Sequence, residues 1–230
     1  AIENLNKFLK QAPQKAIDND YRYLGNAMLR ISPADTAAAV ANLEKAAEMD
    51  TVDNGYKEIA AFYNAAKDYE KAIVYYKKVI AREKTPGLQD YVNLSLPLYN
   101  VANRTFASGP DSLALREKKR NYFLAADSLY MKMIERKPDY LYAHGQRAKA
   151  NYFAYTREEA MTNGIAIPLM ENYIKLASAA PMDDAIKANF KLFYQVLGAY
   201  SVITLKDEAK AKEWFTKLLE IDPSNKVAND

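Results

Sequence analysis

Residues 68–80 read Asp68-Tyr69-Glu70-Lys71-Ala72-Ile73-Val74-Tyr75-Tyr76-Lys77-Lys78-Val79-Ile80. If this segment is helical, Ala72, Tyr76 and Val79 share one face, because they are spaced four and then three residues apart. The small Ala72 would let a neighbouring helix approach closely, and the ring of Tyr76 would fill the space one turn later. The charged residues of the segment lie on the other side. The pattern therefore predicts a helix that forms one half of an antiparallel pair.

The same spacing returns at the start of the chain, where Ala1, Leu5 and Phe8 repeat it. We therefore expect residues 1–13 to form the second helix of a pair whose first helix is missing. This reading makes the chain at least partly an internal fragment, and a removed leader is the other explanation for the lack of an initiator methionine. A single amphipathic capping helix over the same residues is the alternative structure.

Two further segments carry an aromatic residue followed by a bulky and then a small residue. They are Tyr21-x-x-Leu24-Gly25 and Tyr56-x-x-Ile59-Ala60-x-x-Tyr63. Together with residues 68–80, these segments resemble tetratricopeptide repeats, a family of helix–turn–helix modules of about 34 residues. The family has an aromatic, then Leu-Gly or Leu-Ala, then Tyr on its first helix, and Ala followed by an aromatic on its second helix. The resemblance extends over nearly the whole chain, although only the unit at 53–86 is close to the standard length.

The resemblance implies an all-α fold, a right-handed α-solenoid in which antiparallel helix pairs stack into a superhelix. The whole chain, residues 1–230, would be a single repeat domain. After the half-unit at 1–13, pairs are expected at 18–51, 53–86, 88–138, 140–181 and 183–223. Two longer insertions, expected as loops at 103–111 and 156–164, stretch the later pairs.

Pro97 and the C-terminal residues 224–230 lead to two local expectations. Pro97 lies inside a helical pattern and should kink or shorten that helix. The last residues, 224–230, are polar and too few for a capping helix. Trp214, Phe215 and Leu218 are therefore expected to be partly uncovered.

Composition favours helix and excludes several kinds of site. Half of the residues are apolar, and only seven glycines and nine prolines occur, a balance that suits helices better than sheets. The net charge of +3 gives no electrostatic reason to expect a nucleic acid as partner. No apolar run approaches the roughly 20 residues that span a bilayer. The absence of cysteine excludes disulfides and thiolate metal sites but leaves the compartment open. A periplasmic or exported location is the first expectation, and the cytoplasm is the alternative.

Catalysis and metal binding have little support in the sequence. The single histidine, His144, falls among the packing positions of its helix. The acidic pair Asp183-Asp184 fits a helix start, where the helix dipole favours negative charge, and Glu158-Glu159 fits either a solvated loop or a helix start. We therefore predict no catalytic residue, no metal site and no cofactor. The basic run at 116–120 is either an exposed helix face or a docking patch for a partner.

The resemblance implies that the first helices line a concave groove that holds a peptide or a partner's helix. The groove residues expected from it share a polar or aromatic side chain on the inner side of a first helix. They are Arg22, Asn26, Arg30, Lys57 and Asn64, and in the later units Tyr99, Gln146, Lys149 and Tyr152. The alternative for each is a merely solvated polar face.

Arg22 and Asn26 resemble part of the arrangement with which some relatives clamp the terminal carboxylate of a peptide. Glu58 stands where that clamp would need Asn, so the complete clamp is absent and binding of a chaperone tail is disfavoured. The sequence thus predicts a non-catalytic protein–protein interaction scaffold, with a protein or peptide as partner and an oligomeric state left open. The alternative is a bacterial cell-surface or periplasmic protein that binds glycans or nutrients through exposed tyrosines. An enzyme with two convergent carboxylates is the third reading.

Overall fold

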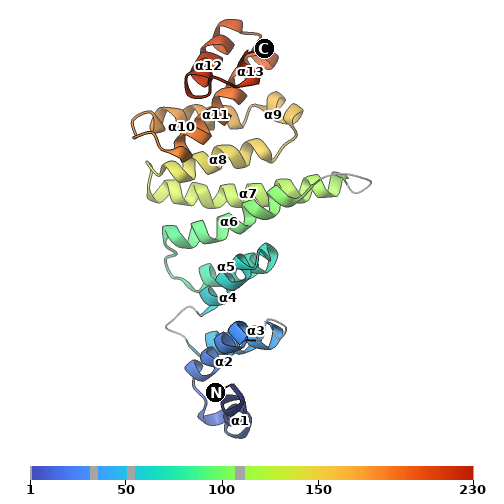
Figure 1. The fold of residues 1–230 in the computed structure, drawn as a ribbon, viewed down its shortest axis with the longest axis vertical. Coiled ribbons are helices and arrows are strands. Elements are labelled where there is room, and N and C mark those ends of the chain that lie inside the picture. Colours follow the sequence, from blue (N-terminus) through green and yellow to red (C-terminus); the bar gives the residue numbers. More distant parts are fainter. Residues whose placement is uncertain (1, 32–35, 51–54, 107–111, 230) are drawn as a thin grey trace. The chain divides into compact units, whose positions relative to one another are not determined.

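The computed structural model describes residues 2–31, 36–50, 55–106 and 112–229, and within these ranges the chain forms helices and contains no strand (Figure 1). The chain divides into two compact units, Ala1–Leu98 and Tyr99–Asp230, and the boundary falls inside one helix. Each unit is described by itself. Among the described residues, no helix combines the length and the apolar character needed to cross a membrane.

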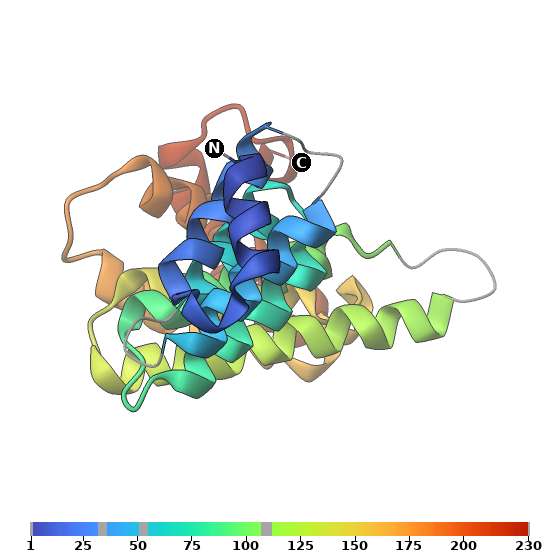
Figure 2. The same cartoon turned by 90° about the horizontal axis from the view of Figure 1, so that it is seen from below.

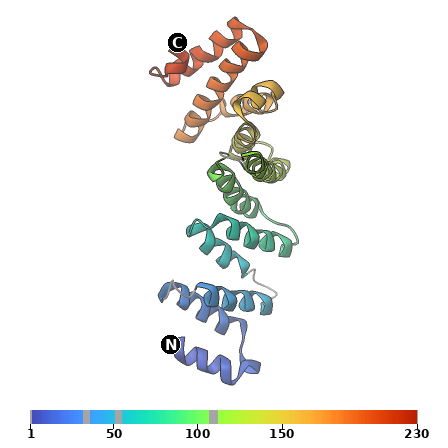
Figure 3. The same cartoon turned by 90° about the vertical axis from the view of Figure 1, so that its right-hand side faces the viewer.

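Unit 1 is built from antiparallel helix pairs that follow one another along the chain. Its elements are α1 (Ile2–Gln11), η1 (Pro13–Lys15), α2 (Asp18–Ile31), α3 (Thr36–Met49), α4 (Tyr56–Ala65), α5 (Tyr69–Arg82) and the first part of α6 (Leu88–Arg104). Helix α2 packs on α3 and α4 packs on α5, and Figure 3 shows the helices of these pairs side by side. Ala1 lies outside the described residues, but Phe8 of α1 packs against the buried Tyr21 of α2.

Small residues allow the close approach within these pairs. A Cβ atom on Gly25 of α2 would lie only 2.7 Å from Leu43 Cγ of α3, so any larger residue would push the two helices apart. Ala60 and Ala72 are fully buried between α4 and α5. The side chain of Asp68 caps α5 by accepting a hydrogen bond from the Lys71 backbone amide at 3.3 Å. The segment at 68–80 is thus helical with its small residue facing its partner helix, as its spacing predicts.

Pro97 was expected to kink or shorten its helix; α6 continues from Leu88 to Arg104 through this residue, so the proline does not shorten it. Proline inside a helix removes one hydrogen bond and costs about 3 kcal/mol. Leu94 and Leu98 are buried on either side of it, at 6% and 3% exposure. Each buried leucine contributes roughly 1.5–3 kcal/mol, which offsets that cost.

Unit 2 continues with the last part of α6 and the remaining helices. These are α7 (Ser112–Arg136), α8 (Leu141–Phe153), α9 (Arg157–Asn163), α10 (Ala166–Ala177), α11 (Asp184–Tyr200), the π-helical η3 (Ser201–Leu205), α12 (Glu208–Ile221) and α13 (Lys226–Asn229). Helix α7, with 25 residues, can be followed as the long light-green ribbon in Figure 2. Helix α8 packs against both α7 and α10, and α11 packs against α12.

The core of unit 2 is aromatic, and glycines again mark the closest approaches. Tyr173 packs edge-on against Phe193, and Tyr194 stacks on Trp214 with ring centroids 5.8 Å apart. A Cβ atom on Gly198 of α11 would lie 2.5 Å from the ring of Phe215 on α12. This explains why a small residue stands at that position.

The structure corrects two expectations in unit 2. The insertion at 156–164 is not a loop, because Thr156 and Glu159 form a capping box that starts helix α9. Trp214 and Leu218 are buried, at 9% and 0% exposure, in the same cluster against which Ala228 of the short helix α13 packs, and only Phe215 of the three expected residues is partly exposed. The other insertion, at 103–111, lies largely outside the described residues.

Candidate functional site

We call the side of each unit formed by the first helices of its pairs the first-helix surface. In unit 1 these helices are α2 and α4, and in unit 2 they are the last part of α6 and α8. Five of the residues expected from the sequence lie in unit 1 and four in unit 2. The two sets are therefore described separately.

The basic residues in unit 1 are engaged by acids of neighbouring helices. Arg22 of α2 donates to Asp50, with 2.7 Å between Nη2 and Oδ2, and both side chains are largely buried. Lys57 of α4 lies 3.1 Å from a carboxylate oxygen of Glu83 and 3.7 Å from one of Asp90 at the start of α6. The hydrogen bond to Glu83 is the main reason why the pKa of Lys57 is raised. These cations thus tie successive helices together.

Asn26 and Glu58, which stand at positions of the incomplete carboxylate clamp, bond to each other. Asn26 of α2 donates to Glu58 of α4 across 3.3 Å between Nδ2 and Oε2. The residue that stands where a clamp would need Asn therefore holds Asn26 instead of a ligand.

Arg30 and Asn64 differ from the other three residues of unit 1. Arg30 lies exposed in the last turn of α2. Asn64 of α4 is half-buried, and among the described residues its side-chain oxygen Oδ1 has no hydrogen-bond partner. Arg30 is therefore open to a ligand, whereas the unpaired oxygen of Asn64 is itself buried.

The two tyrosines expected in unit 2 pack against neighbouring rings. Tyr99 of α6 lies edge-on to Phe123 with centroids 5.1 Å apart, and burial raises the pKa of its hydroxyl to about 12. Tyr152 of α8 lies edge-on to Phe153, also at 5.1 Å, and burial raises its pKa. Both are half-buried, so neither presents a fully open ring face.

Lys149 of α8 is in a different situation from Arg22 and Lys57. It is half-buried, and burial lowers the pKa of its ammonium group. No carboxylate of the described residues forms an ion pair with it. Gln146 and Tyr152, one turn before and one turn after it on α8, are half-buried as well. Lys149 is therefore a partly desolvated cation that still needs an anionic partner.

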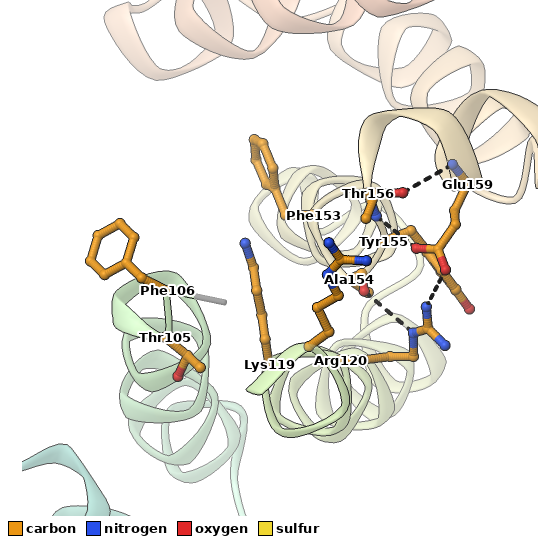
Figure 4. Close-up of a pocket in the computed structure, with 10 residues that line it drawn as sticks. Thr105, Phe106, Lys119, Arg120, Phe153, Ala154, Tyr155, Thr156 and Glu159 are labelled. Carbon is orange, nitrogen blue, oxygen red and sulfur yellow. Dashed lines mark hydrogen bonds and ion pairs between the residues drawn. The ribbon is translucent and has the colours of Figure 1, made fainter. Parts of the chain in front are cut away.

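A pocket of about 280 Å³ lies beyond the end of α6, and sequence reasoning did not locate it. We call it the basic pocket. Its lining comes from the end of α6, from α7, and from the segment that joins α8 to α9 (Figure 4). The lining residues are Thr105, Phe106, Arg116, Lys119, Arg120, Phe153, Ala154, Tyr155, Thr156 and Glu159. The one signal available in the sequence was the basic run at 116–120.

Arg120 is fixed at the wall of the basic pocket. Its guanidinium donates to Glu159 at 3.0 Å and to the carbonyl of Ala154 at 3.5 Å, and it lies over the ring of Tyr155 at 4.6 Å. Glu159 also accepts a hydrogen bond from the Thr156 backbone amide at 2.8 Å. That backbone bond, with help from Arg120, lowers the pKa of Glu159.

A second, larger hollow of about 690 Å³ lies beside α9 and the π-helical turn. Thr204 anchors this turn by donating to the carbonyl of Met161 at 2.9 Å. The hollow is lined by Arg157, Glu158, Met161, Thr162, Ile203 and Thr204, and Ile203 is 46% exposed there.

The remaining titratable candidates have structural roles. His144 bonds the carbonyl of Pro138 through Nε2 at 2.7 Å and faces Asn172 Nδ2 with Nδ1 at 3.2 Å. The carbonyl only accepts, so Nε2 carries the proton and Nδ1 accepts from Asn172. Asp183 caps α11 by accepting from the Ile186 amide at 2.7 Å. In the part of the chain that the structure describes, no group of three metal-binding side chains comes together.

Comparison with known proteins places these features in a family context. The tetratricopeptide repeat model matches residues 56–86 and 193–225. No curated protein matches the chain. The C-terminal part of a TPR repeat-containing protein from Cytophaga hutchinsonii is 21% identical with a TM-score of 0.67, covering 99% of this chain and 78% of that one. YrrB, described as a TPR protein with an unusual peptide-binding site, is 16% identical with a TM-score of 0.55, covering 100% of this chain and 97% of its own.

A double mutant of MamA RS-1 is a third similar structure, 16% identical with a TM-score of 0.52, covering 90% of this chain and 95% of that one. At such identities these likenesses concern the fold alone. They agree with the two matched repeats and with the helix pairs of both units. Residues 56–86 and 193–225 are therefore tetratricopeptide repeats, and the chain has the all-α fold of the tetratricopeptide-repeat solenoids, as the sequence predicts.

Proposed function

We propose that this chain is a non-catalytic protein-interaction scaffold that binds a peptide or a partner segment on its first-helix surfaces. The observation that carries the proposal is Lys149, a half-buried cation on α8 without a carboxylate partner among the described residues. A cation in such a place costs stability unless an anion compensates it. A partner that brings a carboxylate to Lys149 would supply that compensation.

The neighbours of Lys149 suit a peptide better than a free ion. Gln146 offers an amide that can both donate to and accept from a peptide backbone. Tyr152 combines a packed ring with a hydroxyl that can reach a polar partner. YrrB, which has a similar fold, is described as having a peptide-binding site, and this agrees with a peptide ligand here.

In unit 1, the proposed contacts fall into two groups. Arg30 is exposed, and Asn64 has an unpaired oxygen that is buried, so a ligand would have to uncover that atom to bond it. Arg22, Asn26 and Lys57 are held by acids of the same unit, so a ligand would have to compete with those bonds. We assign the first group a direct role and the second group mainly the spacing of the helices.

The alternative of glycan binding is not supported by Tyr99 and Tyr152. Sugar stacking needs open ring faces, whereas Tyr99 and Tyr152 are half-buried and packed edge-on against phenylalanines. The interaction scaffold is the function that these residues support better.

The test is a peptide selection followed by a matched pair of variants. Peptides that bind the full chain are selected from a displayed random library, and their affinity is measured by fluorescence anisotropy. Lys149→Met keeps the length of the side chain and removes its charge, and we expect it to weaken binding by about tenfold or more. Lys212→Met removes an exposed charge on α12 and serves as the control. Equal affinity of the two variants for every selected peptide would refute the assignment.

A further inference from the structure

The basic pocket carries more positive charge than its own carboxylate can balance. Three cations line it, Arg116, Lys119 and Arg120, against the one acid Glu159. Both oxygens of Glu159 are already used, Oε1 by Arg120 and Oε2 by the Thr156 backbone amide. Glu159 is therefore already engaged by Arg120 and by the start of α9.

Arg116 and Lys119 have no ion pair with any carboxylate of the described residues. They are three residues apart on α7, so they lie on neighbouring positions of one helix face. Figure 4 shows the Lys119 side chain rising from α7 into the space between the residues of α6 and α8. Together they form a place where an anion would meet two positive charges.

Aromatic side chains stand beside these cations. Phe106, just beyond the end of α6, is 79% exposed, and Phe153 at the end of α8 is half-buried. Large apolar side chains so exposed are informative when they adjoin a pocket, because burying one on binding contributes roughly 1.5–3 kcal/mol. Figure 4 shows both rings at the same pocket, on separate elements. The pocket thus offers an apolar contact next to its anion site.

The size of the pocket limits what it can hold. Sites for whole small-molecule ligands usually measure about 300–1,000 Å³, and this one is about 280 Å³. One or two amino-acid side chains fit that space better than a complete metabolite.

We propose that the basic pocket binds an acidic peptide segment of a partner protein, in which an Asp or Glu carboxylate meets Arg116 and Lys119 and an adjacent aromatic side chain packs on Phe106 and Phe153. The site uses other side chains than the first-helix surface around Lys149. It adds the chemistry of the partner segment to the proposed scaffold function and stands without Lys149. Arg120 positions the wall through Glu159 and does not itself need to touch the ligand.

The probe is a fluorescein-labelled decapeptide with a central Glu-Phe-Glu-Phe sequence between Gly-Ser flanks, titrated against the full chain by anisotropy. Two matched peptides replace either both Glu by Gln or both Phe by Ser. We expect saturable binding of the first peptide, and at least about tenfold weaker binding of each of the other two. No saturation below about 1 mM, or equal binding of the Gln peptide, would overturn the proposal.

Variants then locate the site on the protein. Arg116→Ala combined with Lys119→Ala should weaken binding of the probe by about tenfold or more. Lys118→Ala lies on the same helix outside the pocket lining and should leave binding within about twofold. Lys212→Met removes an exposed charge on α12, outside the pocket lining, and should also leave binding within about twofold. Unchanged binding by the double variant would overturn the proposal.

Inorganic phosphate distinguishes a peptide site from a general anion site. Phosphate has the charge of the ligand but none of its apolar surface. Sodium phosphate and sodium chloride are compared at the same ionic strength. We expect phosphate to displace the probe no more than chloride does. Displacement by phosphate beyond the effect of chloride, with the Ser peptide binding as well as the peptide that contains Phe, would mean that the pocket recognises anions in general.

Discussion

The basic residues of the two first-helix surfaces differ in what surrounds them. Arg22 and Lys57 each face a carboxylate of the same unit at 2.7 Å and 3.1 Å. Lys149 is half-buried without such a partner among the described residues. The sequence predicts that all three are polar positions on first helices, but it does not show which of them an acid reaches. Asp50 is 28 residues from Arg22, and Glu83 is 26 residues from Lys57, and only the packing of the pairs brings them together.

Lys149→Met should stabilise the folded protein. Because burial lowers the pKa of Lys149, the folded state disfavours its charged form, and that cost is fully present at neutral pH. Removing the charge should raise the free energy of unfolding by on the order of 1 kcal/mol. Urea unfolding at pH 7 measures this difference.

The effect of Lys149 on stability should also depend on pH. Since the pKa is lowered in the folded state, the unfolded chain binds more protons between the folded-state pKa and the ordinary value of 10.5. The stability of the wild type relative to Lys149→Met should therefore rise as the pH increases through that window. A variant less stable than the wild type at pH 7 would show that Lys149 has a stabilising partner.

Gly25→Ala tests the close approach of α2 and α3. The added Cβ atom would lie 2.7 Å from Leu43 Cγ and 2.8 Å from the carbonyl oxygen of Ala39, and backbone atoms cannot yield easily. We expect a loss of about 1–3 kcal/mol, as for overpacked cores. Gly87→Ala is the matched control, because its Cβ atom would meet only Asp90 Oδ2 at 3.6 Å. A loss in the control as large as in Gly25→Ala would contradict this account.

At the scale of elements, helix α9 shows what sequence reasoning missed and why. The pattern Thr156-x-x-Glu159 is the signature of a capping box, and the structure forms both of its hydrogen bonds, at 3.2 Å and 2.8 Å. The capping-box pattern was present in the sequence, but a helix of 7 residues is too short to show a periodic pattern of apolar residues. The helices of pairs 18–51 and 53–86 are longer and carry the small–aromatic spacing, so their type could be predicted.

Thr156→Ala should weaken the start of α9. The substitution removes the hydroxyl that accepts from the Glu159 amide, and loss of such a cap typically costs about 1 kcal/mol. Because this hydrogen bond fixes the first turn of α9, the variant should also increase the hydrogen exchange of the α9 amides. Hydrogen exchange measured peptide by peptide checks this, with Thr162→Ala as the control on the same helix. Equal exchange in the two variants would contradict a special role of the cap.

At the scale of the whole molecule, the repeats explain why the fold could be predicted from the sequence and the basic pocket could not. The fold follows from local spacing, because each helix pair packs through small and aromatic residues that lie within about 34 residues of one another. The lining of the basic pocket spans residues Thr105 to Glu159, on α7, α8, α9 and the segments that follow α6 and α8, and no local pattern joins them. The first-helix surface lies between these cases, since its positions are predictable but its ion pairs and burial are not.

The most direct measurement of the interaction proposal asks where a bound peptide lies. A photo-crosslinking amino acid replaces Gln146, beside Lys149 on α8, and in a control chain it replaces the exposed Lys212 on α12. A peptide selected on the unmodified full chain is added, and the crosslinked product is quantified by mass spectrometry. The scaffold account predicts efficient crosslinking from position 146, suppressed by excess unlabelled peptide, and little from position 212. Crosslinking from 212 and not from 146, for a peptide that still binds, would contradict it.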